Sequence, residues 1–125
     1  MIGSDTSFII DFLKGEVAAI AAMEKYREQI YLCEPVVFEF LCGNLTAAET
    51  EKFHTFVSKF TVFNFDRNSS VTAAALLRTC KRLGKSISNP DAMIAGTYRA
   101  NHINAIITRN KNHFQHISQI KVITY

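Results

Sequence analysis

Hydrophobic and polar positions divide the chain into short apolar runs that alternate with longer segments of helical spacing. The short runs predict buried strands at residues 2–4, 30–33, 61–65 and 104–108, with a weaker one at 122–125. The longer segments predict helices at residues 7–14, 16–29, 36–42, 46–59, 69–85 and 89–101. This alternation predicts an α/β fold whose sheet is mainly parallel and is covered by helices on both faces.

Local signals support several of these boundaries. Gly15 closes the first predicted helix, and Pro35 and Pro90 each open a segment, as proline does in a first helical turn. Thr46 and Glu49 have the spacing of a capping box. The chain has no repeat or linker, so residues 1–125 predict a single domain.

Three acidic residues lie in unusually apolar surroundings. Asp5 follows the first predicted strand, Glu39 interrupts an apolar helix, and Asp91 follows Asn89-Pro90 at a helix start. A carboxylate among apolar groups is costly unless it is compensated, and one shared cation would compensate all three. Each also has a purely structural reading: Asp5 as a helix cap, Asp91 as a favourable acid in a first turn, and Glu39 at a partly exposed edge. Because oxygen donors dominate and histidines are few, the ion expected is Mg²⁺, with Mn²⁺ as an alternative.

Composition adds modest limits. The chain of 125 residues is 48% hydrophobic and 20% charged, with a net charge of +3 that is compatible with a nucleic-acid partner. Its three cysteines, Cys33, Cys42 and Cys80, are odd in number and widely spaced, which argues against a disulfide framework or a zinc site. With no apolar run of about 20 residues and no evident signal peptide, the expectation is a cytoplasmic protein without a membrane segment.

A basic stripe is predicted on the helix at 69–85. Arg78, Lys81, Arg82 and Lys85 follow the spacing i, i+3, i+4 and i+7, which places four cations on one side of a helix. An RNA backbone would bind such a stripe in a salt-dependent way, although a solvated helix face has the same pattern.

Together, these residues resemble the PIN-domain ribonucleases, and among them the VapC toxins of type II VapBC toxin–antitoxin systems. The resemblance extends from residue 2 to about 118 and lies in the order of four segments: Ile2-Gly3-Ser4-Asp5-Thr6-Ser7, continued by Asp11 and Leu13-Lys14-Gly15; Glu39; Asn89-Pro90-Asp91-Ala92-Met93-Ile94-Ala95; and Thr108-Arg109-Asn110 with His113-Phe114. The family implies a three-layer α/β/α sandwich with a central, mainly parallel sheet.

The resemblance also implies an activity, namely Mg²⁺-dependent cleavage of RNA by a metal-activated water. Asp5, Glu39 and Asp91 would hold the metal, and Asn110 would orient a metal-bound water. Thr6 and Thr108 would hydrogen-bond the carboxylates or their waters. Arg109 is the preferred phosphate contact, and Lys14 and Lys111 lie near the predicted site.

The partners implied are an RNA substrate, a VapB-like antitoxin and a second copy of the chain in a homodimer. The apolar stripe formed by Phe53, Phe56, Val57 and Phe60 is most simply core, but it has the pattern of a dimer face or an antitoxin groove too.

Two alternatives stay open. Asn110 stands where relatives often carry Asp, and His113 where some carry Asp, so the chain could be an impaired domain that binds RNA or a protein without cleaving. A phosphatase or phosphoacceptor domain built on Asp5 is disfavoured, because the phosphatase pattern needs an acid at position 7, where Ser7 stands.

Overall fold

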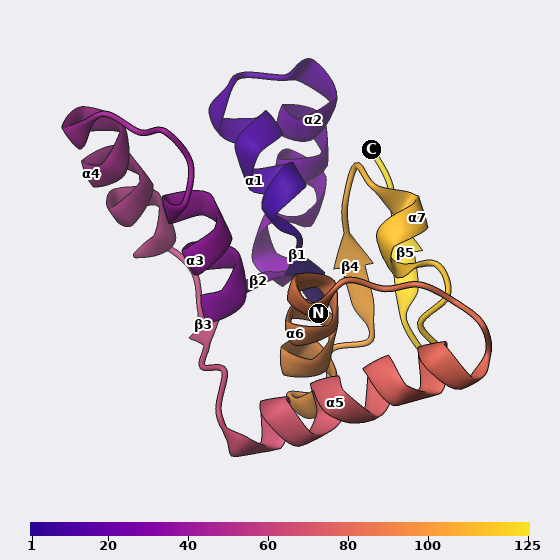
Figure 1. Cartoon of the computed structure of the whole chain (residues 1–125). Helices are drawn as coiled ribbons and strands as arrows, with labels where there is room; N and C mark the ends of the chain where they lie inside the picture. The colour runs from indigo at the N-terminus through magenta and orange to yellow at the C-terminus, as the bar shows by residue number, and fades with distance from the viewer.

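Five short strands form one parallel sheet at the centre of the molecule (Figure 1). The structure is a computed structural model that describes residues 1–125. The strands are β1 (Ile2–Ser4), β2 (Ile30–Cys33), β3 (Val62–Phe63), β4 (Ala105–Ile107) and β5 (Lys121–Ile123), in the order β3-β2-β1-β4-β5. β1 is central: Gly3 is paired with Tyr31 on one side and with Ile106 on the other.

Helices fill every connection between the strands. They are α1 (Thr6–Leu13), α2 (Val17–Tyr26), α3 (Glu34–Leu41), α4 (Ala47–Val57), α5 (Arg67–Arg82), α6 (Asn89–Ala100) and α7 (Lys111–Phe114), with a short 3₁₀ turn η1 (Arg27–Gln29) before β2. None of these helices has the length and apolar character needed to cross a membrane.

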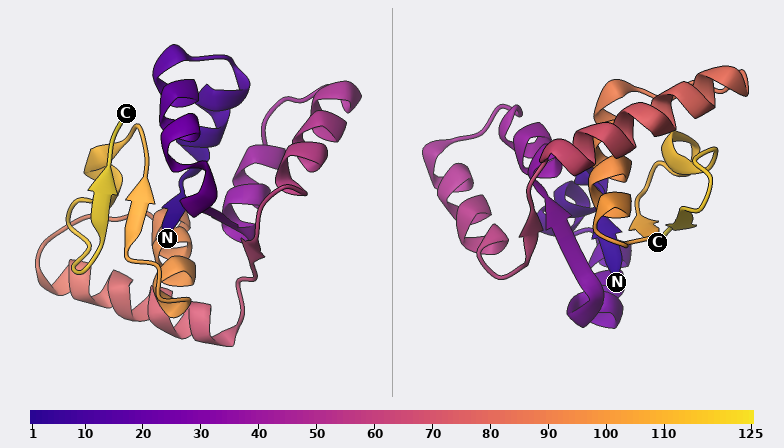
Figure 2. Two further views of the ribbon diagram at one scale, coloured as in Figure 1. Left: turned by 180° about the vertical axis from the view of Figure 1, so that it is seen from behind. Right: turned by 90° about the horizontal axis from the view of Figure 1, so that it is seen from below.

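The strand order separates the helices into two layers. The connections from β1 to β3 move toward one edge of the sheet, whereas those from β3 to β5 move the opposite way. Because such crossovers are right-handed, the two sets of helices lie on opposite faces. The views in Figure 2 agree, with α1 and α2 on one side of the sheet and α5 and α6 on the other. The predicted three-layer α/β/α sandwich is therefore confirmed.

Close packing fixes α6 against both the sheet and α5. The ring of Tyr98 is fully buried on Gly3, where an added Cβ would lie 2.4 Å from the ring. The Tyr98 hydroxyl donates to the Ser4 carbonyl at 2.6 Å. On the outer side of α6, a Cβ added at Gly96 would meet Ala73 of α5 at 2.5 Å. These two approaches set the position of α6, whose first turn carries Asp91.

Several predicted boundaries need correction. The helix expected over 16–29 ends at Tyr26 and continues as η1, and α7 replaces a segment for which no helix was predicted. The strand expected at 61–65 keeps only two residues, and the last strand begins one residue earlier than predicted. The helix expected over 69–85 begins at Arg67 and ends at Arg82.

That last correction changes the predicted basic stripe. Gly84 adopts φ +68°, a left-handed conformation that no α-helix continues, so Lys85 lies beyond α5. Arg78, Lys81 and Arg82 remain on α5 and are exposed, and Lys85 is exposed in the following loop. The prediction that all four cations share one helix is wrong for Lys85.

Candidate active site

The candidate site is a hollow of about 350 Å³ at the carboxyl ends of β1 and β4. The chain leaves β1 and β4 in opposite directions along the sheet, and α/β folds bind ligands at such a reversal of strand order. Asp5, Glu39, Asp91, Arg109 and Asn110 all line it, from four segments far apart in the sequence. Thr6 lines it too, and Thr108, which does not line it, is hydrogen-bonded to Asp5.

Asp5 is held by one hydroxyl from α1 and one from the residue that follows β4. Its Oδ2 accepts from the Ser7 hydroxyl at 2.8 Å and from the Thr108 hydroxyl at 2.7 Å. Although Asp5 occupies the cap position of α1, its side chain makes no capping hydrogen bond. The capping explanation for this buried acid therefore fails, and two hydroxyls orient the carboxylate instead.

Glu39 and Asp91 are fixed in a similar way. The Thr6 hydroxyl donates to Glu39 Oε1 at 2.7 Å, and His113 Nδ1 lies 3.2 Å from Asp91 Oδ2. Each of the three carboxylates thus has one oxygen held by a protein group, while no hydrogen bond involves the second oxygen.

Burial and mutual repulsion make Glu39 and Asp91 weaker acids. The pKa of Glu39 is raised, first by burial and then by the negative charges of Asp5 and Asp91, against the hydrogen bond from Thr6. The pKa of Asp91 is raised chiefly by burial, with a smaller contribution from Asp5, while Ser88 and His113 act in the opposite direction. The hollow therefore concentrates negative charge that the protein only partly compensates.

The donor set fits a hydrated Mg²⁺ or Mn²⁺ ion. No three His, Cys, Asp or Glu side chains converge closely enough to hold one ion between them. Mg²⁺ keeps several waters and is commonly bound through one or two carboxylates, and the free oxygens of Asp5, Glu39 and Asp91 can serve as direct ligands or as acceptors for those waters. A zinc site, with its nitrogen and sulfur ligands, does not fit these oxygens.

The cysteines do not supply a nucleophile to the hollow. Burial raises the pKa of the Cys33 thiol to about 12, so it stays protonated near neutral pH. Cys42 is exposed and Cys80 is buried, and neither lines the hollow.

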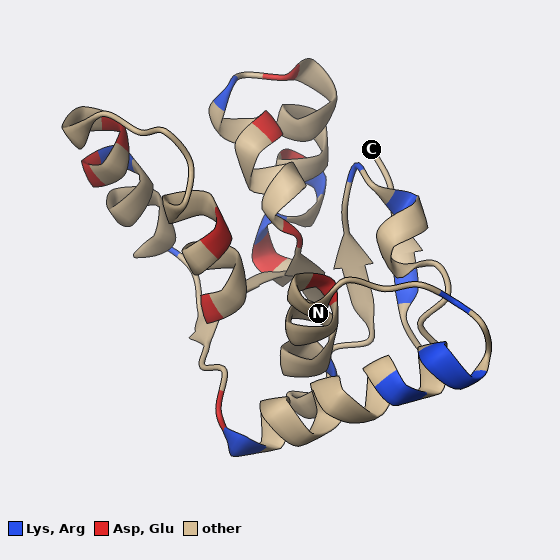
Figure 3. Ribbon diagram, viewed as in Figure 1, with Lys and Arg blue, Asp and Glu red and all other residues tan.

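The predicted basic residues lie mostly outside it. Lys14 follows α1 and Lys111 begins α7; both are exposed, and neither lines the hollow. Figure 3 shows blue positions on the last turns of α5 and on the loop beyond it, away from the acidic start of α6. Arg109 is the single Lys or Arg among the lining residues.

Sequence reasoning gave no structural role to four residues that support the site. Ser7 links Asp5 to the backbone of Arg109, and Ser88 caps α6 by accepting from the Asp91 amide at 3.2 Å. Tyr125 donates a partly buried hydrogen bond to Asp11 beside Arg109. The Ser88 signal was present in the sequence, since Ser88-x-x-Asp91 has capping-box spacing, whereas the partners of Asp11 had no local signal.

The repulsion at Glu39 predicts a gain of stability on its neutralisation. In metal-free protein, Glu39→Gln should raise the melting temperature by roughly 2–4 °C, because Gln keeps an acceptor for Thr6 and removes a desolvated, repelled charge, while solvent screening keeps the gain small. The folded state binds the Glu39 proton more tightly than the unfolded chain does. The contribution of Glu39 to wild-type stability is therefore lost as pH rises from 4.5 through the raised pKa of the folded state, and the gain from Glu39→Gln should be larger at pH 7 than at pH 4.5.

Differential scanning fluorimetry in EDTA measures this effect. Glu34→Gln is the matched control, since Glu34 is exposed on the same helix and does not line the hollow. An equal shift in both variants would mean that the hollow exerts no special repulsion on Glu39.

Comparisons with known proteins agree with this geometry. The family described as the PIN domain matches residues 4–120. No curated protein matches the chain by sequence. Among solved structures, VapBC2 from Rickettsia felis, bound to a DNA fragment from its promoter, is similar with a TM-score of 0.85 at 18% identity, over 100% of this chain and 99% of that chain.

Two further structures give the same result. A toxin–antitoxin complex from Klebsiella pneumoniae has a TM-score of 0.82 at 24% identity, over 99% of this chain and 97% of that chain. FitAcB from Neisseria gonorrhoeae has a TM-score of 0.83 at 22% identity, over 98% of this chain and 96% of that chain. At these identities the likeness establishes a shared fold.

Proposed function

Because the chain belongs to the PIN domain family, we propose that it is a Mg²⁺-dependent endoribonuclease and the toxin component of a VapBC-type toxin–antitoxin module. PIN-domain proteins are generally nucleases and typically use divalent metal ions. The observation that carries the proposal is the arrangement of Asp5, Glu39 and Asp91, each with one oxygen held and one free, around a hollow at the reversal of strand order.

The residues of the hollow would share the work of phosphodiester hydrolysis. A bound Mg²⁺ ion supplies Lewis-acid activation of the phosphate and of water. Asp5, Glu39 and Asp91 would hold it, with Thr6 and Thr108 fixing the orientation of the carboxylates. Asn110 lines the same hollow and would orient a water by its side-chain amide, while Arg109 would bind the phosphate.

RNA cleavage by the purified chain without a partner tests this proposal. The substrate is an RNA pool incubated with Mg²⁺, with Mn²⁺, or with EDTA. We expect cleavage with either metal and none in EDTA. Activity that survives EDTA would contradict a metal-dependent mechanism. RNA binding without cleavage under all conditions would favour the alternative of an impaired domain, for which the amide at Asn110 is the supporting feature.

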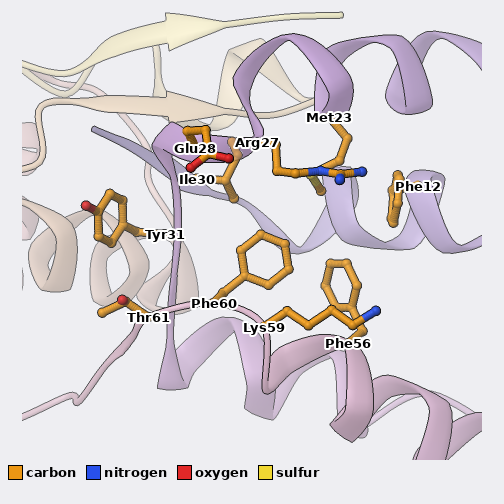
Figure 4. Close-up of a pocket in the computed structure, with 10 residues that line it drawn as sticks. All are labelled: Phe12, Met23, Arg27, Glu28, Ile30, Tyr31, Phe56, Lys59, Phe60 and Thr61. Carbon is orange, nitrogen blue, oxygen red and sulfur yellow. The ribbon is translucent and has the colours of Figure 1, made fainter.

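The proposed antitoxin would bind an apolar groove between the helices α1 and α2 and the end of α4. The groove has a volume of about 420 Å³. Figure 4 shows its lining, in which Phe12 and Met23 face Phe56 and Phe60. Phe56 is buried and Phe60 is half-buried, so the stripe predicted on the helix at 46–59 is core for the most part but is also open along this groove. Arg27 and Lys59 lie beside the apolar rings and outnumber Glu28, the one acid of the lining, which suits a VapB-like segment carrying apolar and acidic side chains.

Charge placed in the groove should separate antitoxin binding from cleavage. Phe60→Asp is expected to weaken binding of the co-expressed VapB-like antitoxin by about 100-fold, since a carboxylate buried in the complex loses an apolar contact without gaining a partner. Cleavage by the free chain should remain. Affinity is measured by calorimetry, with Leu83→Asp as the control, because Leu83 is 63% exposed on the distant end of α5. Equal loss in both variants would rule out this groove.

The remaining partners follow from the same proposal. We propose a homodimer, for which the exposed apolar side chains of Phe38 (69%) and Val71 (61%) offer contact surface. We also propose that Arg78, Lys81, Arg82 and Lys85, together with Lys14 and Lys111, attract the RNA backbone in the cytoplasm.

A further inference from the structure

Asp11 is a buried acid of α1 that the proposed chemistry does not use. Its exposed fraction is 6%, and a carboxylate at that depth needs polar partners. Both of its oxygens have one. Arg109 Nη1 donates to Oδ1 in a salt bridge, and the Tyr125 hydroxyl donates to Oδ2 at 2.7 Å. The partners come from segments that follow β4 and β5, so Asp11 links α1 to two other strand ends.

Arg109 is held at two points by α1. Its backbone N–H donates to the Ser7 hydroxyl at 3.1 Å, and that hydroxyl in turn donates to Asp5 Oδ2. Its guanidinium is anchored on Asp11, but 54% of the Arg109 side chain is exposed. A guanidinium has five N–H donors, so the contact with Asp11 leaves others for a ligand.

The negative charge around the hollow makes the position of Arg109 important for binding a phosphate. Asp5, Glu39 and Asp91 repel a phosphodiester, and Arg109 is the single Lys or Arg that lines the hollow. Arginine can bind a phosphate through two parallel hydrogen bonds, but only when its plane is correctly oriented. An arginine already fixed on Asp11 loses less rotamer entropy when it binds than a free one does.

We propose that Asp11, itself held by Tyr125, is a positioning residue that fixes the Arg109 guanidinium for binding the phosphate of the substrate RNA. This inference rests on the proposed nuclease function. The competing explanation is that Arg109 merely neutralises a buried carboxylate. The two explanations differ in what happens when Asp11 loses its charge, because a guanidinium that only neutralises would then be free to attract RNA more strongly.

A double-mutant cycle on RNA cleavage distinguishes them. Asp11→Asn is expected to lower kcat/KM about tenfold and Arg109→Gln about 100-fold, since a misplacement of about 1 Å can cost about that much. The double variant should be no worse than Arg109→Gln alone, because Asp11 acts through Arg109. Tyr125→Phe should lower kcat/KM by about threefold, as it removes one donor from Asp11 and leaves the salt bridge.

The matched control is Asp66→Asn. It raises the net charge by one as Asp11→Asn does, but at the exposed cap of α5, where Asn caps equally well. It should leave kcat/KM unchanged. Melting temperatures of all variants verify folding, and rates are compared at temperatures where each variant is folded.

Each outcome decides one question. Full nonadditivity of Asp11→Asn and Arg109→Gln supports the positioning role. Additive losses, or faster cleavage by Asp11→Asn at low salt, would overturn it while leaving the nuclease intact. Wild-type protein that neither cleaves nor binds RNA with Mg²⁺ would overturn the proposed function, and the positioning role with it.

Discussion

Asp5→Asn is expected to reduce Mg²⁺-dependent RNA cleavage by at least about 100-fold, while the protein remains folded. The substitution keeps the shape of the side chain but removes the negative charge nearest the reversal of strand order. The two hydroxyls that now donate to Oδ2, those of Ser7 and Thr108, can still donate to an amide oxygen. With the amide oxygen in the position of Oδ2, the NH₂ group takes the position of the free oxygen, where it would repel a cation.

Cleavage kinetics with a defined RNA oligonucleotide measure this loss, and fluorimetry with added Mg²⁺ gives an independent reading. Wild-type protein should gain stability from Mg²⁺ by mass action, and Asp5→Asn should gain much less. Thr108→Val provides an intermediate case, since it keeps the carboxylate but removes one of its two donors. A variant Asp5→Asn that cleaves at the wild-type rate would remove Asp5 from the site.

The largest expected effect on stability belongs to Gly96→Ala. The new Cβ would lie 2.5 Å from the Cβ of Ala73 and 2.6 Å from its backbone N and Cα. Because these are backbone and Cβ atoms, the clash can be removed only if α5 or α6 shifts as a whole. We expect an overpacking cost of about 3 kcal/mol against a gain of about 1 kcal/mol that alanine brings to a helix, which leaves a net loss of about 2 kcal/mol. The melting temperature should fall by roughly 10 °C.

The sign of the change in stability tests whether the contact with α5 outweighs helix propensity. Helix propensity alone predicts that Gly96→Ala stabilises the protein, whereas the contact with α5 predicts the opposite. Gly43→Ala is the control, because its Cβ would meet only the Phe40 carbonyl, at 3.3 Å, in an exposed segment. Since α6 also carries Asp91, the surviving folded fraction of Gly96→Ala should cleave RNA more slowly than wild type.

The sequence carried enough information to predict the layers and the acids of the site. Short apolar runs between helical segments are sufficient to indicate a parallel sheet, and acids at the ends of such runs are expected to meet at its carboxyl edge. Asp5 and Asp91 stood out because they follow a strand and open a helix, and Glu39 because it interrupts an apolar face. The structure brings all three to one hollow.

What the sequence concealed depends on contacts over long separations. The sequence assigned no contact to Asp11, whose partners Arg109 and Tyr125 lie 98 and 114 residues away. Local spacing carries no information about such pairs. The end of α5 was missed for a different reason: the cations continue the helical spacing through Lys85, but Gly84 turns the backbone out of the helix.

The long separation between Asp5 and its hydroxyl donor Thr108 also concerns the chain while it is being made. Thr108 is added 103 residues after Asp5, which corresponds to about 5–20 s at common rates of synthesis. Until β4 leaves the ribosome, Asp5 lacks one of its two donors and the central strand lacks a neighbour. For the proposed nuclease, we therefore expect the nascent chain to be inactive until β4 has emerged and Thr108 can donate to Asp5.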